Sequence, residues 1–241
     1  MAATGAFCAV IPCLNEARHI GDVVAGVRRH LAHVLVVDDG SSDDTATRAA
    51  TAGAEVLRHA NSRGKGAALA TGLARADQAG ALWALCLDGD GQHASEDIPT
   101  FLAAAARTSA SLIIGNRFAQ PLRMPPLRRS VNLLMSWLIG SLVGCDIPDS
   151  QCGFRLIQLD LWRRLNLASR RFEVESEMIV AGLRCGSKIE FVPVRSVYGD
   201  ETSKISPVRD GWRWLQWYRG ALRNRNSDPH PTPPNTNLRS S

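Results

Sequence analysis

The sequence predicts an α/β fold in which a Rossmann-like, doubly wound and mostly parallel sheet carries helices on both faces. Two observations support this prediction. Short apolar runs alternate with segments of helical periodicity through residues 6–115, and several of these runs end abruptly in acidic or glycine-containing loops. Buried parallel strands have such continuous apolar runs, and open α/β sheets bind ligands at the carboxyl ends of their strands. With 241 residues and 45% hydrophobic content, one large domain with an ample core is expected.

Each element of the sheet region is predicted from its own pattern. Apolar side chains recur on one helical face of residues 20–31, at positions 20, 23, 24, 27 and 31, which predicts a helix. Ser42 or Asp43 is a suitable N-cap for the helix after the second strand. The predicted strands are residues 6–11, 34–37, 54–57, 81–87 and 111–115, and the later predicted helices are a segment ending near 78 and residues 96–107.

The pattern changes from about residue 119, where prolines interrupt a basic segment. Residues 131–143 are strongly apolar, and Asn132, Ser136, Gly140 and Gly144 are spaced four apart as a thin face of small or polar residues. A run of this length is too short to span a bilayer, so it predicts a helix that is either buried or lies in an interface.

The C-terminal third is expected to hold a helix at residues 175–183, a strand at 188–197 and a final amphipathic helix. The last helix carries a stripe of apolar residues opposite arginines 209, 213 and 223, and its members are Trp214, Trp217, Tyr218, Ala221 and Leu222. The expected organisation is an α/β domain over residues 1–206, a Trp- and Arg-rich helix over 207–225 and a disordered tail over 226–241.

Acidic residues follow three of the predicted strands. Asp88 and Asp90 end the run at 81–87, with Gly89 between them. Carboxylates fixed by a strand suit a hard divalent cation, which also takes phosphate oxygens. Asp39 and Glu16 end two other strands, where a carboxylate can accept hydrogen bonds from a ribose or a base. The three together favour a nucleotide site over ordinary acidic turns.

Four ordered motifs make this interpretation more specific. They are Val10-Ile11-Pro12-Cys13-Leu14-Asn15-Glu16, residues 36–45 (Val-Val-Asp-Asp-Gly-Ser-Ser-Asp-Asp-Thr), Gly64-Lys65-Gly66, and Asp88-Gly89-Asp90-Gly91-Gln92-His93. Together they resemble the family-2 GT-A glycosyltransferases. Residues 115–118 (Gly-Asn-Arg-Phe), 149–155 (Asp-Ser-Gln-Cys-Gly-Phe-Arg) and 198–204 (Tyr-Gly-Asp-Glu-Thr-Ser-Lys) resemble that family's dolichyl-phosphate mannosyltransferase-like branch, the polyprenyl-phosphate glycosyltransferases. The resemblance covers about residues 6–210.

The resemblance implies a role for each matching residue. Pro12, Glu16 and Asp39 would hold the nucleoside of a nucleotide-sugar. Asp88 and Asp90, with Gln92, would hold Mg²⁺ or Mn²⁺ on its diphosphate. Lys65 and Gly89 belong to the donor-binding motifs, and Arg117 and Lys204 would contact phosphate and act with Asp90 in catalysis. Leu14 stands where the family commonly has an aromatic residue, and Gly89 replaces its usual Ala, a change expected to be harmless.

The implied reaction inverts the configuration at the sugar carbon and moves a mannose or glucose from GDP-mannose or UDP-glucose to a polyprenyl or dolichyl phosphate. Metal and basic side chains would neutralise the departing diphosphate. A phosphate acceptor is already a nucleophilic oxyanion, so no catalytic base is assigned, although Asp149, Glu173 and Glu175 are available. Two alternatives stay open: a saccharide or small-molecule acceptor, whose hydroxyl would need such a base, and a nucleotide-sugar-binding scaffold, which the Asp88/Asp90 pair disfavours.

Charge and cysteine content suggest partners and a compartment. The net charge of +5 is concentrated in residues 98–145, with five arginines and no acid, and in residues 204–225. These blocks adjoin the apolar and Trp-rich segments and suggest phosphate or an anionic membrane surface, with no nucleic-acid partner; packing on the domain's own core is the alternative for each segment. The six cysteines form no CxxC pair and no signal peptide is evident, so we expect reduced thiols in a cytoplasmic protein bound peripherally to the cytoplasmic face of a membrane.

Overall fold

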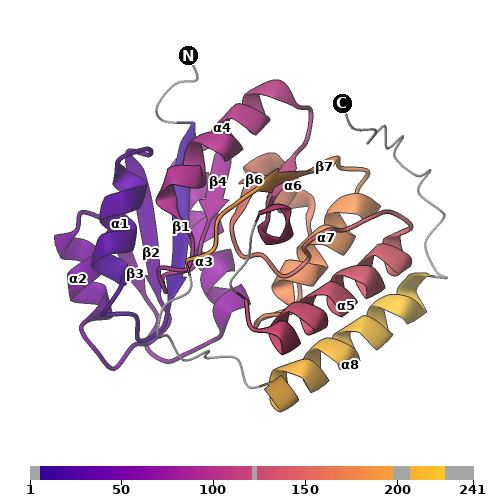
Figure 1. Ribbon diagram of the computed structural model, residues 1–241. Coiled ribbons are helices and arrows are strands. Elements are labelled where there is room, and N and C mark those ends of the chain that lie inside the picture. Colours follow the sequence, from indigo (N-terminus) through magenta and orange to yellow (C-terminus); the bar gives the residue numbers. More distant parts are fainter. Residues whose placement is uncertain (1–5, 121–123, 198–206, 226–241) are drawn as a thin grey trace.

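The protein was analysed as a computed structural model that describes residues 6–120, 124–197 and 207–225. Seven strands form one sheet in the order β3-β2-β1-β4-β6-β5-β7 (Figure 1). The strands are β1 (Phe7–Cys13), β2 (His33–Asp38), β3 (Glu55–Arg58), β4 (Trp83–Cys86), β5 (Leu112–Asn116), β6 (Arg155–Gln158) and β7 (Ile189–Pro193). The helices are α1 (Ile20–Arg28), α2 (Thr45–Thr51), α3 (Lys65–Gln78), α4 (Ile98–Arg107), α5 (Pro126–Val143), α6 (Leu159–Arg164), α7 (Val174–Arg184) and α8 (Pro207–Arg225), with 3₁₀ turns η1 (Ser95–Asp97) and η2 (Arg117–Ala119).

The predicted mostly parallel sheet is confirmed, and one strand departs from it. β6 runs antiparallel to both of its neighbours, β4 and β5, and the sequence did not reveal it. The strand is short and begins with Arg155, a fully buried guanidinium that donates to the backbone carbonyls of Ser150, Cys152 and Glu175. A charged residue at the start of a four-residue segment hides the apolar run that marks the other strands. Because β6 opposes both neighbours, β4 and β5 point the same way and their carboxyl ends lie at one edge.

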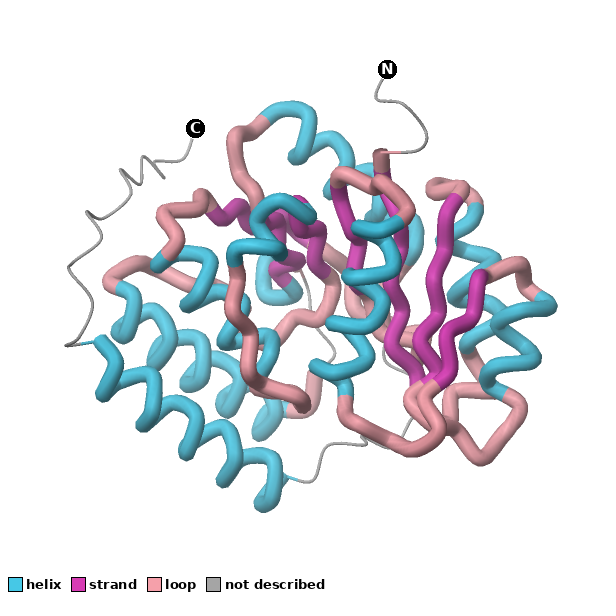
Figure 2. Tube along the Cα trace, turned by 180° about the vertical axis from the view of Figure 1, so that it is seen from behind, coloured by secondary structure: helices cyan, strands magenta, loops and turns pink. Residues whose placement is uncertain are grey.

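The two faces of the sheet are covered by different helices. Figure 1 shows α1 and α2 on one face, and Figure 2, the view from behind, shows α3 on the other. Gly72 of α3 permits a close approach, because a Cβ there would lie 2.4 Å from Cγ1 of Val10 in β1. This arrangement is the doubly wound layering that the alternation of strands and helices predicts.

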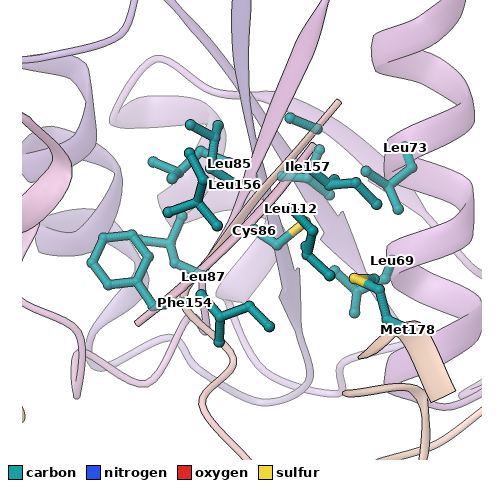
Figure 3. Packing of buried hydrophobic residues seen from close by; sticks show 14 of the residues in the cluster. Leu69, Leu73, Leu85, Cys86, Leu87, Leu112, Phe154, Leu156, Ile157 and Met178 are labelled. Atoms are coloured by element: carbon teal, nitrogen blue, oxygen red, sulfur yellow. The ribbon is translucent and has the colours of Figure 1, made fainter. Parts of the chain in front are cut away.

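Side chains of β4 and β6 form the centre of the core. Figure 3 shows Leu85 and Leu87 on one side of these strands with Phe154, and Cys86 on the other side with Leu73 of α3. All of these residues are at most 2% exposed. The strand ends that carry Asp88 and Asp90 therefore rest on a rigid, close-packed support. Burial raises the pKa of the Cys86 thiol to about 12, and all six cysteines are free thiols, as expected.

Helices α5 and α8 lie side by side at the C-terminal end of the sheet (Figures 1 and 2). The helix predicted at residues 131–143 is confirmed and starts earlier, at Pro126. Its buried face is mixed, since the polar Asn132 and Ser136 are buried together with the apolar Ile139 and Leu142. On the opposite face, Leu134 and Trp137 are 54% and 65% exposed, so this helix exposes large apolar side chains while it buries two polar ones.

The Trp-rich stripe of α8 divides between packing and exposure. Trp214 and Tyr218 are buried, at 7% and 8% exposure, so for these two residues the alternative of packing on the domain's own core holds. The exposed large apolar residues of α8 are Trp212, Leu215 and Leu222. Among the described helices, none is long and apolar enough to cross a bilayer. The predicted tail, residues 226–241, lies outside the described residues.

Candidate active site

A pocket of about 530 Å³ lies at the carboxyl ends of β1, β2 and β4 and extends to η2 after β5. Every site residue predicted from the sequence within the described residues lines it. These residues are Pro12, Glu16, Asp39, Lys65, Asp88, Gly89, Asp90, Gln92 and Arg117. Lys204 lies outside the described residues. The prediction that these strand ends converge is therefore confirmed, while the role of each residue toward a ligand stays a prediction.

At the β2 end of the pocket, Asp39 holds a loop in place. Its carboxylate accepts hydrogen bonds from the backbone N–H of Gly64 (2.8 Å), the Ser62 hydroxyl (2.8 Å) and the backbone N–H of Arg63, and it lies 2.6 Å from Nδ1 of His59. Burial alone would raise the pKa of Asp39, but these donors outweigh it and the pKa is lowered. Asp39 therefore holds loop 59–64 at this end of the pocket. Nothing in the local sequence marked His59, which sits twenty residues away from its partner.

The loop after β1 is fixed to the loop after β2. The backbone N–H of Glu16 donates to Oγ1 of Thr45 (2.8 Å), and the backbone N–H of Asn15 donates to Oγ of Ser41 (2.8 Å). Asn15 has a φ of +54°, a left-handed conformation that Asn tolerates better than most residues. These contacts hold Glu16 and Asp39 at one end of the pocket, where the sequence predicts the nucleoside.

Asp88 and Asp90 stand together at the β4 end. Burial, followed by the charge of Asp88, raises the pKa of Asp90. A cation bound between the two carboxylates would remove this repulsion, so the residues present fit a divalent metal. The described residues contain no cluster of three or more His, Cys, Asp or Glu side chains that could hold a metal. Diphosphate and water oxygens would have to complete the shell, which is the usual pattern for Mg²⁺.

Lys65 balances the charge of Asp88 from the start of α3. Its Nζ lies 2.6 Å from Oδ1 of Asp88 and 2.6 Å from Oε1 of Glu175, a residue of α7. Burial would raise the pKa of Asp88, but the Lys65 charge and the nearby His93 outweigh it and lower that pKa. Burial likewise opposes the charge on Lys65, and the two carboxylates raise its pKa nonetheless. Lys65 is thus a permanent cation at the metal end of the pocket.

The glycines that flank Lys65 serve a close packing contact. A Cβ on Gly64 would lie 2.4 Å from the carbonyl oxygen of Arg170, and one on Gly66 would lie 2.4 Å from that of Ser169. The backbone N–H of Ala67 also donates to the Arg170 carbonyl (3.3 Å). The Gly-Lys-Gly motif therefore lets loop 169–171 cover the start of α3.

Gly89 packs directly against Cys13, with no room for a Cβ unless the Cys13 side chain moves. A Cβ at this position would lie 2.4 Å from Sγ of Cys13, which is buried in β1. The Cys13 sulfur thus occupies the space that the methyl group of an alanine would need. Cys13 and Gly89 are complementary in size at the base of the loop that carries Asp88 and Asp90.

Arg117 is clamped by Asp149. Its Nε lies 2.8 Å from Oδ2 and its Nη2 lies 2.9 Å from Oδ1, so the pair is bidentate. Asp149 is fully buried, which removes it from the candidate bases. Of the other two, Glu173 lies at a separate shallow groove, while Glu175 lines the main pocket in its ion pair with Lys65. Sequence reasoning assigned no role to Arg128, Gln151 and Arg171, which also line the pocket. Arg128 lies in the basic block at 98–145 and Gln151 in the motif at 149–155, which were the signals for these two.

The sheet is mostly parallel and carries carboxylates at three strand ends, with a paired-aspartate loop and a half-buried lysine beside it. This arrangement is that of a GT-A glycosyltransferase, an enzyme that transfers sugars from nucleotide donors. The match to a family model specifies the class further. The model described as Glycosyl transferase family 2 matches residues 8–161, and the chain belongs to that family.

Relatives and a solved structure agree with this assignment. Glycosyltransferase AglJ of Haloferax volcanii is 34% identical over 91% of this chain and 73% of its own length. A UDP-N-acetylglucosamine–dolichyl-phosphate N-acetylglucosaminyltransferase of Methanococcus voltae is 29% identical over 78% of this chain and 84% of its own. An undecaprenyl-phosphate mannosyltransferase of Micrococcus luteus is 29% identical over 78% and 82%. The fold matches glucosyl-3-phosphoglycerate synthase of Mycobacterium tuberculosis, crystallised with Mn²⁺, UDP and phosphoglyceric acid, with a TM-score of 0.70, 20% identity and coverage of 92% and 79%.

Proposed function

We propose that this enzyme transfers a hexose from a nucleotide-sugar to a polyprenyl phosphate at the surface of a membrane, with inversion at the sugar carbon. The proposal rests on the composition of one end of the pocket, the end nearest η2 and α5. This end is called the acceptor half. Arg117 of η2 and Arg128 of α5 line it, and the adjoining helices α5 and α8 expose apolar side chains. An anionic headgroup on an apolar chain would find both of its chemical features matched there.

The opposite end of the pocket, the nucleotide half, would take the donor. Pro12, Glu16 and Asp39 would hold the nucleoside, directly or through loop 59–64. Asp88, Asp90 and Gln92 would hold Mg²⁺ or Mn²⁺, which supplies a Lewis acid that neutralises the leaving diphosphate. The crystallised relative of this fold, which binds Mn²⁺ and UDP, supports this assignment. Whether the donor is GDP-mannose, UDP-glucose or UDP-N-acetylglucosamine is left to experiment, since the relatives named above differ in their sugar.

The chain's own residues have distinct tasks in the transfer. Lys65 keeps a positive charge beside Asp88, where charge grows as the nucleoside diphosphate departs. Asp149 fixes the direction of the Arg117 guanidinium, so that this cation is oriented before a phosphate arrives. Lys204, in the matching family motif, would be a further phosphate contact. A phosphate acceptor needs orientation rather than a base, and these groups supply it.

The exposed faces of α5 and α8 form a candidate membrane surface. Its apolar members, here called the apolar patch, are Leu127, Val131, Leu133, Leu134, Trp137, Trp212, Leu215 and Leu222. Exposed arginines lie on the same two helices, at positions 129, 209, 219 and 223. Trp and apolar side chains favour the interface, and arginines favour anionic lipid headgroups. The occupant we infer is therefore the anionic cytoplasmic face of a bilayer.

One observation favours a second candidate, a saccharide or small-molecule acceptor. Oε2 of Glu175 is buried and has no hydrogen-bond partner among the described residues, as a base waiting for a hydroxyl would be. Its other oxygen is paired with Lys65 at 2.6 Å, which stabilises the carboxylate and weakens it as a base. The lipid acceptor is therefore preferred.

Transfer of radiolabelled sugar into a lipid extract tests the proposal. The purified protein would be incubated with each labelled donor, polyprenyl phosphate and Mn²⁺, and the organic phase would be counted with and without excess chelator. Metal-dependent label in the lipid phase with one of the donors is expected. Label that appears only in water-soluble products would favour the second candidate, and absence of transfer with every donor and acceptor would leave a nucleotide-sugar-binding scaffold.

A further inference from the structure

A buried chain of hydrogen bonds links α8 to the wall of the pocket. The indole Nε1–H of Trp214 donates to Oγ of Ser176 in α7 (2.9 Å). Nε2 of Gln151, which lines the pocket, donates to the same oxygen (3.0 Å) and to Oγ of Ser150 (2.8 Å). The backbone N–H of Ser150 donates to Oγ of Ser136 in α5 (2.8 Å). Trp214, Ser176, Ser150 and Ser136 are all buried.

Three consecutive residues, 149–151, form the centre of this network. Asp149 clamps Arg117, Ser150 binds α5, and Gln151 binds α7 and, through Ser176, α8. Each residue of the tripeptide thus fixes a different element around the acceptor half of the pocket. Since all members of the network except Gln151 are buried, loss of one donor leaves a partner that must reorient or stay unsatisfied.

Trp214 occupies a special place in the network because an indole nitrogen can only donate. Its bond uses an acceptor site of the Ser176 hydroxyl and so limits how that hydroxyl can meet the Gln151 amide. Two other hydrogen bonds of α8, from Arg184 to the Ala221 carbonyl and from Tyr218 to the Leu138 carbonyl, do not join this network. Packing alone would hold the ring in place, but it would not orient an amide.

We propose that Trp214 is a positioning residue for the acceptor half of the pocket, which it controls through Ser176 and Gln151. The inference rests on the proposed function, because it takes the acceptor to be a phosphate on a prenyl chain. It gives α8 a second role besides membrane contact. The packing of α8 on α7 fixes the orientation of the Gln151 amide and, through the adjacent Asp149, the orientation of the Arg117 guanidinium. Loss of the hydrogen bond from Trp214 to Ser176 should not affect the nucleotide half, which is built on β1, β2 and β4.

Replacement of Trp214 by Phe tests the proposal, with Tyr218→Phe as the matched control. Each change removes one hydrogen-bond donor from a buried ring on α8, but the Tyr218 hydroxyl donates to the Leu138 carbonyl (3.2 Å) and not to the network. Calorimetry would measure the affinity for farnesyl phosphate, a short prenyl phosphate, with Mn²⁺ and saturating UDP or GDP present. It would also measure the affinity for each nucleotide in the presence of Mn²⁺.

The expected result is selective for the acceptor. Trp214→Phe should weaken farnesyl phosphate binding about tenfold, the effect of about one buried hydrogen bond, and change nucleotide affinity by less than about twofold. Tyr218→Phe should leave both affinities within about twofold of wild type. Ser176→Ala should reproduce the effect of Trp214→Phe, and the double variant should be no weaker than either single one, because both changes break the same chain.

Other outcomes separate the two claims. Equal losses from Trp214→Phe and Tyr218→Phe, or a loss of nucleotide affinity as large as that of farnesyl phosphate, would overturn the positioning role. If wild type binds UDP or GDP but no farnesyl phosphate, the lipid acceptor and this inference both fail. If it binds neither nucleotide, the proposed function fails at the donor. Should Trp214→Phe not fold, as judged by circular dichroism, Ser176→Ala carries the test alone.

Discussion

The two halves of the pocket are built in opposite ways. In the nucleotide half, polar residues such as Asp39 and Asp88 directly follow buried apolar strands, so function begins where the apolar run ends. In the acceptor half, the polar residues Asn132 and Ser136 are buried while Leu134 and Trp137 of the same helix are exposed. The first half is an ordinary α/β site, whereas the second half combines buried polar groups with exposed apolar ones. The proposed contact of the second half with a membrane would use this difference.

The strongest effect is expected in the nucleotide half, from loss of the metal. Asp90→Asn should lower turnover by about 10²–10³-fold, because the metal loses one of its two carboxylates. Sugar transfer at saturating donor, measured across a Mn²⁺ series, checks this. Excess chelator should have a similar effect on wild type and should be reversed by added Mn²⁺. Full activity in chelator would contradict the metal assignment.

The same substitution should leave the fold intact. Burial and Asp88 raise the pKa of Asp90, so the metal-free fold favours its protonated form. That contribution to stability is complete below the ordinary Asp pKa of about 3.9 and is lost as the pH rises through the raised value. In chelator at neutral pH, Asp90→Asn should therefore melt no lower than wild type, and any advantage should vanish below about pH 4. A large loss of melting temperature would mean that Asp90 is structural.

A smaller effect is expected from Asp39→Ala, which removes the carboxylate that holds loop 59–64. Affinity for the free nucleoside diphosphate should fall on the order of tenfold, since several hydrogen bonds to one buried group are lost. Farnesyl phosphate binding should be unchanged if the halves are as separate as their construction suggests. Calorimetry with each ligand measures both, and unchanged nucleotide affinity would show that Asp39 only shapes the fold.

The fit between Cys13 and Gly89 predicts a rescue. Gly89→Ala should displace the aspartate loop and weaken Mn²⁺ binding, measured with nucleotide present, by roughly tenfold, because the new methyl group meets the Cys13 sulfur. Removing that sulfur in Gly89→Ala/Cys13→Ala should restore affinity to within about threefold of wild type. A double variant as impaired as Gly89→Ala alone would contradict the size complementarity.

The smallest single effects are expected at the apolar patch. Leu134→Ser and Trp137→Ser should each weaken binding to anionic vesicles by about fivefold, as partly inserted side chains are lost. Leu82→Ser is the matched control, since Leu82 is 64% exposed and precedes β4, at the opposite edge of the sheet. Binding should fall as salt rises, through the arginines.

Two outcomes would reassign the patch. Equal losses from Leu134→Ser and Leu82→Ser would show that exposure alone, and not position, decides vesicle binding. Absence of vesicle binding at low salt, with a dimer in light scattering that Trp137→Ser dissociates, would assign the patch to a second copy of the chain.

The nucleotide half could be predicted almost completely from the sequence because its residues are local to their strands. Asp39, Asp88 and Asp90 follow apolar runs whose ends must meet at one edge of a parallel sheet. What could not be predicted are contacts between distant segments, such as His59 with Asp39 or Lys65 with Glu175. No periodicity in either segment encodes such a partner.

In the acceptor half, prediction was limited by a different cause. Periodicity correctly gave a helix at 131–143 and the polar face at Asn132 and Ser136, but it does not state which face is buried. The usual rule buries the apolar face, and here Ser136 is inside while Trp137 is outside. The same ambiguity affected α8, where Trp214 and Trp212 lie two residues apart and face in and out. β6 was missed because Arg155 interrupts its apolar pattern.

The closure of loop 169–171 over Gly64 and Gly66 has a consequence for how the chain folds. Lys65 and its flanking glycines contact Glu175 and loop 169–171, which are synthesised more than a hundred residues later. The contacts at the start of α3 therefore cannot form early in synthesis. Such distant contacts must overcome the entropy of a long loop before they stabilise anything, and they slow folding. A nascent chain that ends before α7 would expose Lys65 and two glycines at an unfinished helix start. We expect the six strand–helix units that precede α7 to stay loosely ordered until α7 leaves the ribosome and docks.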